Sequence, residues 1–374
     1  MTNNHGHGHH HPEHVVKPRV LFICKQSEAE SGTFYGYFRK YSGLFISARL
    51  VSRMLETHLG IHSETVVARD NNDIDSLVTK HKPTHVFIEA YWVVPEKFEI
   101  LAKLHPKVTW IVRVHSEIPF FALEGMSMDW TLRYLDYKNV MLAPNSPRIF
   151  NDIREVLLQK YDAEFVDRRI VYLPNFYEPK CDDGYVVGHK KHIDIGCFGS
   201  IRPLKNQLIQ AIAAMTFADQ IGLPMRFHVN SNRVESHGSP VLKNLRQLFG
   251  ESGRHELVEH AWMPHHVFKD LIKTMEIGMQ VSFTETFNII MADFVTLGVP
   301  VVTSAEVWWL PGHVHADPTD SVDIVKKLSR VWTGRLFNLQ HLNNRGLIKY
   351  SDDSVNRWDN FLVPVQPHHH HCKD

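Results

Sequence analysis

The segment SFTETFNIIMADFVTLGVPVV (282–302) determines how the second half of the chain is interpreted. An apolar, strand-like run ends in a polar turn, a helix-like period follows, and Gly-Val-Pro-Val-Val returns to strand-like residues. A strand, a crossover helix and a further strand form the unit of parallel sheets. Two carboxylates, Glu285 in the loop and Asp293 within the helix, have seven residues between them. They cannot form a same-face pair, so we predict that they contact different parts of one elongated ligand.

The start of the predicted helix suits an anion. The first backbone N–H groups of a helix have no partner within it, and the helix dipole places partial positive charge beside them. In this segment those groups lie near Phe287, Asn288 and Ile289. We therefore predict a phosphate between the contacts made by Glu285 and Asp293.

Strand-like and helix-like segments alternate through most of the chain. The first strand-like run is PRVLFICKQ (18–26), and further apolar runs follow up to RIVYLP (169–174). The pattern starts again at HIDIGCFGS (192–200). Continuous apolar strands joined by crossovers are typical of parallel sheets that are covered on both faces. The sequence therefore predicts an α/β protein with two doubly wound, Rossmann-like domains that face one another across a cleft.

The domain boundaries follow from composition and periodicity. A polar stretch with Pro and Gly at about 175–191 separates the two halves, and Ser351 is the predicted N-cap of a final helix. The two tails are rich in histidine; flexible polyhistidine binds divalent metals wherever it occurs, so we assign no biological metal to it. The predicted divisions are a disordered His-rich tail (1–17), an N-terminal domain (18–180), a C-terminal domain (190–345), a closing helix (346–362) and a second disordered His-rich tail (363–374).

Composition excludes several classes of protein. In 374 residues, 41 basic side chains balance 41 acidic ones, so phosphate neutralisation alone does not hold this chain on nucleic acid. Four scattered cysteines without a CxxC pair indicate neither a disulfide framework nor a thiolate zinc site. No apolar run approaches the roughly 18 residues of a membrane span, and the polar N-terminus lacks a secretory signal. We expect a cytoplasmic protein without integral membrane association.

The 282–302 segment resembles the signature of the family 4 retaining glycosyltransferases and their relatives of GT-B fold. In that signature a Glu, seven residues and a second Glu precede a small-residue and Gly-Val-Pro-Val-Val stretch. Two residues depart from it: Asp293 replaces the second Glu, and Asn288 stands where the family usually has Gly. A shorter carboxylate still accepts hydrogen bonds from ribose hydroxyls, and Asn is the non-glycine residue that best tolerates a positive φ. The resemblance implies a GT-B fold and a nucleoside diphosphate sugar as donor.

The segment DIGCFGSIRPLKNQLIQAIAAM (194–215) resembles the first strand, loop and helix of the same family's nucleotide-binding domain. By that resemblance Arg202 and Lys205 bind the donor diphosphate, which a guanidinium and an ammonium neutralise without a metal. Taken alone, the two side chains are more simply two solvated cations in a surface loop. His115, just beyond a predicted strand, matches a family histidine that faces the donor sugar; the alternative is a structural hydrogen-bonding role.

The resemblance implies a complete set of site residues. Glu285 would contact the donor sugar, Asp293 the ribose, and Trp262 and Met263 the nucleobase. The predicted catalytic residues are His115, Glu285, Arg202 and Lys205. The predicted donor-binding residues are Gly43, Gly199, Trp262, Met263, Phe287, Asn288, Ile289 and Asp293.

The acceptor is predicted from a different segment. The loop SGTFYGYFRKYSGLF (31–45) mixes aromatic and basic side chains, a combination that stacks on a sugar ring or an unstacked base and contacts phosphate. Tyr37, Arg39 and Lys40 are its predicted acceptor-binding residues. The alternative is an ordered loop anchored in the core.

These patterns lead to one expected function. We expect a retaining, metal-independent glycosyltransferase with no separate cofactor and a donor that is a nucleoside diphosphate sugar, UDP-linked by preference. The chain also looks similar to stand-alone glycosyltransferases of tailed phages, which points to a 5-hydroxymethylpyrimidine base in phage DNA as acceptor and to the host cytoplasm as location. A base target would have to be flipped out of the duplex.

Other functions remain open. The acceptor is alternatively a glycan, a glycolipid or a small molecule. A non-catalytic GT-B protein that binds a nucleotide or a glycan is a rival because Asn288 and Asp293 both depart from the motif. A sugar-nucleotide epimerase of similar two-domain architecture is a third possibility.

Overall fold

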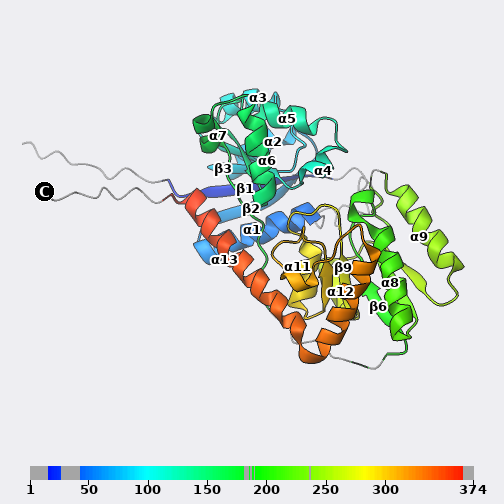
Figure 1. Cartoon of the computed structure of the whole chain (residues 1–374). Coiled ribbons are helices and arrows are strands. Elements are labelled where there is room, and N and C mark those ends of the chain that lie inside the picture. Colours follow the sequence, from blue (N-terminus) through cyan, green and yellow to red (C-terminus); the bar gives the residue numbers. More distant parts are fainter. Residues whose placement is uncertain are drawn as a thin grey trace, which may run out of the picture.

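The computed structural model describes residues 16–26, 43–180, 185, 188, 190–235 and 237–364, which form two α/β domains (Figure 1). Each domain contains one five-stranded sheet whose paired strands are all parallel. The His-rich tails, except for residues 16, 17, 363 and 364, lie outside the described residues. So do Tyr37, Arg39 and Lys40 of the predicted acceptor loop.

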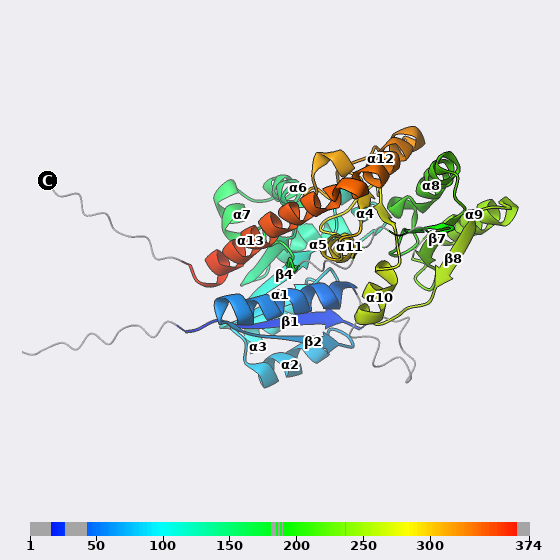
Figure 2. The same cartoon turned by 90° about the horizontal axis from the view of Figure 1, so that it is seen from below.

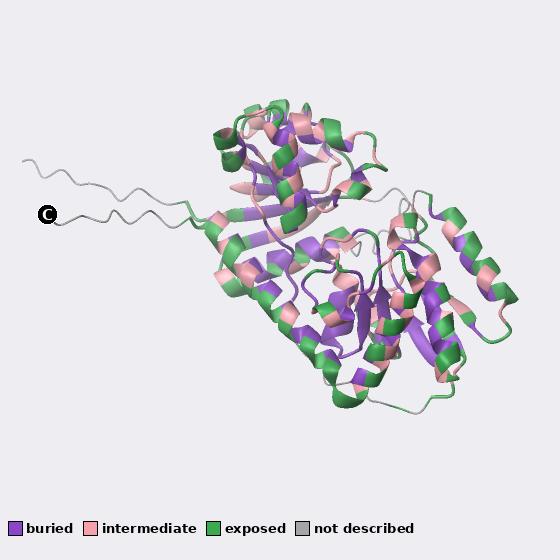
Figure 3. Cartoon of the chain, in the orientation of Figure 1, coloured by how far each residue is buried: buried purple, intermediate pink, exposed green. Residues whose placement is uncertain are grey.

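The first sheet has the order β2-β1-β3-β4-β5. Alternate residues of its strands point to opposite faces, so Leu21 and Ile23 enter one core cluster while Val20 and Phe22 enter the other. Both faces are therefore buried, as continuous apolar strands require (Figure 3). The strands are β1 (Arg19–Lys25), β2 (His62–Ala68), β3 (His85–Glu89), β4 (Thr109–Val114) and β5 (Val140–Pro144), and the helices are α1 (Gly43–Leu59), α2 (Asp73–His81), α3 (Lys97–Leu104), α4 (Ile118–Phe121), α5 (Ser127–Tyr134), α6 (Pro147–Leu158) and α7 (Ala163–Arg169).

The second sheet has the order β10-β9-β6-β7-β8. Its strands are β6 (Ile193–Gly196), β7 (Met225–Asn230), β8 (Glu256–His260), β9 (Ile277–Gln280) and β10 (Val301–Thr303). Its helical elements are η4 (Pro203–Lys205), α8 (Gln207–Ile221), α9 (Ser239–Glu251), α10 (His265–Ile272), α11 (Ile289–Thr296), η5 (Gly312–Val314), α12 (Ser321–Gly334), η6 (Arg335–Phe337) and η7 (Leu339–His341).

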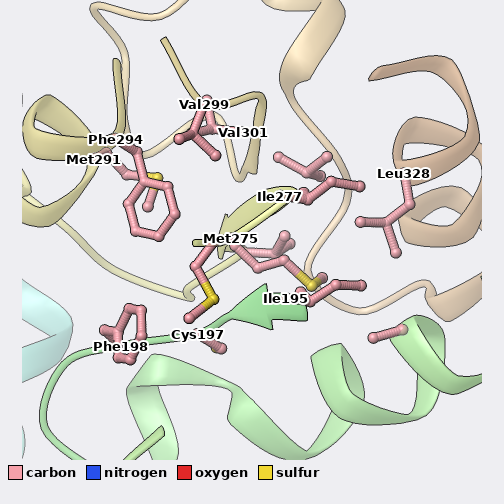
Figure 4. Close-up of a cluster of buried hydrophobic side chains, with 14 of the residues drawn as sticks. Ile195, Cys197, Phe198, Met275, Ile277, Met291, Phe294, Val299, Val301 and Leu328 are labelled. Carbon is pink, nitrogen blue, oxygen red and sulfur yellow. The ribbon is translucent and has the colours of Figure 1, made fainter. Parts of the chain in front are cut away.

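Helix α11 lies close to this sheet because a glycine on β9 leaves room for an aromatic ring. A Cβ atom at Gly278 would lie 2.5 Å from the Phe294 ring, which is closer than real Cβ contacts allow. Figure 4 shows Phe294 and Met291 of α11 beside Val299 and Val301 in the core of this domain. The close approach fixes the start of α11, where the 282–302 motif places its polar residues.

Helix α13 (Leu342–Leu362) crosses from the second domain back to the first (Figure 2). Leu347 and Tyr350 near its start belong to the second domain's core, whereas Trp358 and Leu362 near its end belong to the first domain's core. The helix also binds the backbone of the segment that joins the domains: Trp358 Nε1 donates to Pro174 O at 2.8 Å. One helix therefore ties both domains together.

Several sequence predictions differ from the structure. The closing helix starts at Leu342 rather than at residue 346, and Ser351 lies inside it; its hydroxyl donates to Tyr177 O at 2.6 Å instead of capping a helix. RIVYLP (169–174) forms only a single bridge, at Ile170, because the chain leaves the sheet there toward the second domain.

We predict that Trp358→Ala lowers the free energy of unfolding by about 3 to 5 kcal/mol, because it removes a fully buried aromatic side chain from the first domain's core. Chemical denaturation followed by tryptophan fluorescence and circular dichroism measures this. Trp308→Ala, at a position that is 42% exposed, is the matched control and should cost distinctly less. Equal losses in the two variants would contradict the role given to α13.

Candidate functional site

A polar pocket lies between the two domains. It is lined by His115, Ser116, Glu117 and Phe120 from the segment after β4 and by Arg202, Thr284, Glu285 and Thr286 from the loops after β6 and β9. All of these segments follow the carboxyl ends of parallel strands, where ligands of open α/β sheets bind. Three of the four predicted catalytic residues line this pocket, and the fourth, Lys205, bonds to Glu285.

Lys205 and Glu285 form an ion pair, with Lys205 Nζ 2.5 Å from Glu285 Oε1. Their side chains are only 12% and 7% exposed. The two residues come from loops after different strands, and Phe283 N donates to Leu204 O at 2.9 Å, which joins the same loops through their backbones. The predicted cation and carboxylate therefore share one place in the structure.

Gly199 lies beside this ion pair. Its φ is +116°, a conformation that favours glycine. A Cβ atom there would lie 3.9 Å from Lys205 Cε and 3.6 Å from Ile290 Cδ1. These are ordinary van der Waals distances, so the position favours glycine for its φ and not for space.

Arg202 contacts both domains. Its Nη1 donates to Glu235 Oε2 at 2.8 Å within the second domain, and its guanidinium lies over the Phe120 ring of the first domain, 4.7 Å from the ring centroid. Burial alone would raise the pKa of Glu235, but the charge of Arg202 and the hydroxyl of Ser200 favour the carboxylate, so its pKa lies below the usual value. Contacts with Glu235 and Phe120 therefore fix the Arg202 guanidinium at the wall of the polar pocket.

Three polar atoms in the lining residues of the polar pocket are buried without a hydrogen-bond partner among the described residues. They are Glu117 Oε2, Arg202 Nε and Thr284 Oγ1. An unpaired buried polar atom costs roughly 1–3 kcal/mol, so such groups are expected to gain partners when a polar ligand binds. Glu117 also accepts a hydrogen bond from Ser146 Oγ at 2.5 Å, and burial raises the pKa of its carboxyl.

The nitrogens of His115 both face protein groups. Nε2 bonds to the buried carboxylate of Glu89, and Asn145 Nδ2 lies 3.3 Å from Nδ1. Burial lowers the pKa of His115, which the Glu89 charge partly offsets. Both nitrogens of His115 therefore have protein partners in this arrangement, as in the structural hydrogen-bonding alternative, while the residue also lines the polar pocket.

Glu89 is the centre of this buried chain of polar groups. Burial opposes its ionisation, but the charges of Arg113 and His115 outweigh that effect and lower the pKa of the Glu89 carboxyl. Arg113 Nη1 lies 3.6 Å from Glu89 Oε1, and Arg113 is itself fully buried. Sequence reasoning missed Glu89, although it ends a predicted strand just as His115 follows one.

A second pocket, more apolar, lies beside the start of α11 and is called the apolar pocket below. It is lined by residues of both domains: Gly43, Ile46, Asn230, Asn232, Arg233, Trp262, Met263, His265, Phe268, Ile289, Ile290 and Asp293. Five predicted donor-binding residues are therefore together here, namely Gly43, Trp262, Met263, Ile289 and Asp293. Residues 284–290 connect the two pockets, because their first part lines the polar pocket and their last part lines the apolar one.

Asp293 lies at the wall of the apolar pocket but is almost fully buried. Its Oδ1 accepts a hydrogen bond from the Tyr177 hydroxyl at 2.5 Å. His265 Nε2 lies 2.9 Å from Oδ1 and 3.0 Å from Oδ2. Burial and the charge of Asp293 raise the pKa of Tyr177 well above its usual value. The burial and these partners leave little of the Asp293 carboxylate facing the apolar pocket. Sequence reasoning identified neither Tyr177 nor His265 as a partner.

The start of α11 adopts the backbone conformation that its sequence indicates. Asn288 has φ +66° and ψ +86°, its Oδ1 accepts from Met291 N at 3.0 Å, and its Nδ2 donates to Gln280 Oε1 at 2.9 Å. Because Asn288 caps Met291 N–H, a phosphate here would have to use the earlier N–H groups of the helix. The Phe287 side chain lines neither of these two pockets; it stacks on Tyr350 in the core, with ring centroids 4.6 Å apart.

Two further properties concern metals and membranes. Among the described residues, no three His, Cys, Asp or Glu side chains gather in a way that would hold a metal ion. None of the helices in the described part of the chain has the length and apolar character needed to span a bilayer.

Comparison with known proteins was made on sequence and on structure. No protein-family model and no curated protein sequence matches the chain. Several solved structures match over nearly the whole length. HepE (Alr3699) from Anabaena, in complex with UDP and glucose, is 12% identical, with a TM-score of 0.59 and coverage of 91% of this chain and 98% of HepE. An α,α-trehalose-phosphate synthase (UDP-forming) from Burkholderia vietnamiensis is 9% identical, with a TM-score of 0.65 and coverage of 94% and 97%.

A third similar structure is the catalytic domain of starch synthase IV from Arabidopsis thaliana, bound to ADP and acarbose. It is 9% identical, with a TM-score of 0.64 and coverage of 93% of this chain and 99% of that domain. The chain has a GT-B fold. The predicted fold class is thereby confirmed, and at these identities the likeness extends to the fold alone.

We predict that Lys205→Ala lowers the free energy of unfolding by about 3 kcal/mol, because it leaves the Glu285 carboxylate nearly buried without its partner. The double variant Lys205→Ala/Glu285→Gln removes both charges and should lose less than the sum of Lys205→Ala and Glu285→Gln. A double-mutant cycle measured by chemical denaturation tests this. Additive losses would show that the two side chains do not interact in solution.

Proposed function

We propose that the protein is a retaining, metal-independent glycosyltransferase that moves a sugar from a nucleoside diphosphate sugar to an acceptor hydroxyl. The observation that carries this proposal is the polar pocket at the strand ends of a GT-B fold. It brings together Arg202, Glu285 and, through its ion pair, Lys205. Its buried polar atoms without partners suit a ligand rich in hydroxyl and phosphate oxygens.

Each charged side chain then has a part in the transfer. A donor diphosphate would replace Glu285 as the partner of Lys205, which frees the carboxylate to accept hydrogen bonds from hydroxyls of the sugar. As the bond between the anomeric carbon and the phosphate oxygen breaks, Arg202 and Lys205 stabilise the negative charge on the leaving group. The acceptor oxygen bonds to the anomeric carbon on the same face, and its proton passes to the departing phosphate oxygen.

UDP is the proposed donor nucleotide. The names of the similar HepE and trehalose-phosphate synthase structures mention bound UDP or UDP formation, which supports this choice. Starch synthase IV, in contrast, was solved with ADP. In our proposal Trp262 and Met263, both in the apolar pocket, lie against the base, and the diphosphate extends along residues 284–290 to the polar pocket. ADP is the alternative that the same experiments test.

For the acceptor, the narrower proposal is a 5-hydroxymethylpyrimidine base in phage DNA. It draws on the sequence of the 31–45 loop, which lies almost wholly outside the described residues, and the balanced net charge counts against it. A carbohydrate hydroxyl is the alternative, and it is favoured by the names of the similar structures, which concern trehalose phosphate and starch.

Donor hydrolysis without any acceptor tests the catalytic proposal. The wild-type protein should slowly release nucleoside diphosphate from at least one member of a panel of UDP-, ADP- and GDP-linked sugars. Lys205→Ala should slow this release by about 100- to 1,000-fold, as expected for the loss of one preorganised charge at the leaving group. Lys326→Ala, on the exposed side of α12, is the matched control and should behave as wild type. Interconversion of donors would indicate an epimerase, and binding without release a non-catalytic protein.

Nucleoside mass spectrometry tests the acceptor. We expect that incubation of the protein with hydroxymethylated DNA and the donor it hydrolyses produces glycosylated nucleosides. An unchanged nucleoside profile with every donor would exclude DNA, and transfer to free sugars or sugar phosphates would then establish the carbohydrate alternative.

A further inference from the structure

Among the polar side chains that line the apolar pocket, His265 is the one held by Asp293, and neither the sequence motif nor the proposed function uses it. His265 begins α10, and its imidazole is 27% exposed at a wall that it shares with Trp262 and Met263. Its Nε2 bonds to both oxygens of Asp293. The described residues offer no hydrogen-bond partner to Nδ1, so one nitrogen is held by the protein and the other is available.

Asp293 itself is poorly placed to bind a ligand. Its side chain is only 2% exposed, and the Tyr177 hydroxyl and the His265 imidazole lie against it. Although a carboxylate can accept further hydrogen bonds, a ribose hydroxyl would have to enter a nearly closed space to reach it. His265, by contrast, can accept a hydrogen bond at Nδ1 from a hydroxyl while Nε2–H remains bonded to Asp293.

We infer that His265, held in place by Asp293, binds a ribose hydroxyl of the donor nucleotide and takes the part of the second carboxylate in the Glu-x7-Glu pattern. This inference rests on the proposed function, since it requires a nucleotide donor in the apolar pocket. Asp293 is then a positioning residue: it fixes the tautomer and orientation of the imidazole, much as carboxylates orient histidines at metal sites. Tyr177 holds the carboxylate in turn.

The inference explains why Asp replaces Glu at this position. The carboxylate of Asp293 contacts both partners at 2.5–3.0 Å, so an additional methylene has no room unless Tyr177 or His265 moves. Asp293, His265 and Tyr177 therefore form a matched set, in which the shorter acid leaves space for the imidazole. In the proposed arrangement, Nδ1 of the imidazole offers the pocket a hydrogen-bond acceptor in place of the carboxylate.

Nucleotide binding measured by isothermal titration calorimetry tests this inference. The probes are UDP, 2′-deoxy-UDP and 3′-deoxy-UDP, or the ADP or GDP series if one of those nucleotides binds more tightly. Wild-type protein should bind at least one deoxy form about 5- to 20-fold more weakly than the parent nucleotide, as expected for one lost hydrogen bond. In His265→Ala this ratio should fall to within about twofold, because the group that distinguishes the hydroxyl is gone.

Two further variants separate recognition from structure. His266→Ala, at the exposed neighbouring position, is the matched control and should keep the wild-type ratio. His265→Gln retains a hydrogen-bonding side chain and should restore part of the ratio. Near-ultraviolet circular dichroism shows whether each variant is folded, and if His265→Ala is not, the comparison of His265→Gln with wild type decides.

The outcomes are distinct. If UDP binds to the wild-type protein but both deoxy forms bind equally well, or if His265→Ala keeps the full ratio, the inference is overturned and the proposed function stands. If none of UDP, ADP and GDP binds, the proposed function is overturned together with the inference. A ratio that is present in the wild type and in His266→Ala but lost in His265→Ala supports the inference.

Discussion

The ion pair between Lys205 and Glu285 connects the two loops on which the site depends. It does not act alone: Asn206 Nδ2 donates to Val281 O at 2.9 Å, and Val281 N donates to Gln210 Oε1 at 2.7 Å. A nearly buried ion pair gives little net stability because both charges lose their hydration. The ion pair matters instead for where it places the two charges. It holds an ammonium and a carboxylate beside each other at the ends of parallel strands, where an anionic ligand can exchange one partner for another.

The same pocket depends on how the domains are joined. Helix α13 packs into both cores. Its residues Ser351, Ser354 and Trp358 donate hydrogen bonds to backbone carbonyls of the segment that joins the domains. That segment also carries Tyr177, whose hydroxyl binds Asp293 beside the apolar pocket. Residues that set the spacing of the domains are therefore bonded directly to residues of the site. Tyr177 therefore joins the apolar pocket directly to the segment that links the two domains.

Sequence reasoning identified what is local and missed what is assembled by the fold. The order of strand, loop and helix over 282–302 is encoded within that segment. The positive φ of Asn288 is encoded there too, because Asn tolerates a positive φ better than other non-glycine residues do. The partners of Asp293 are not local: Tyr177 lies 116 residues away and His265 lies 28 residues away. Likewise, His115 obtains its partners, Glu89 and Asn145, from neighbouring strand ends. Periodicity predicts the strands but not which side chains meet at their ends.

The two departures from the glycosyltransferase motif are accommodated by the structure around them. Asn288 takes the left-handed conformation of the usual glycine and adds a helix cap through its side chain. Asp293 is shorter than the usual Glu, and His265 and Tyr177 fill the space that results. These two replacements stabilise the structure, because each adds hydrogen bonds that the usual residue would not make in the same way. Both departures therefore leave the local structure around the start of α11 intact.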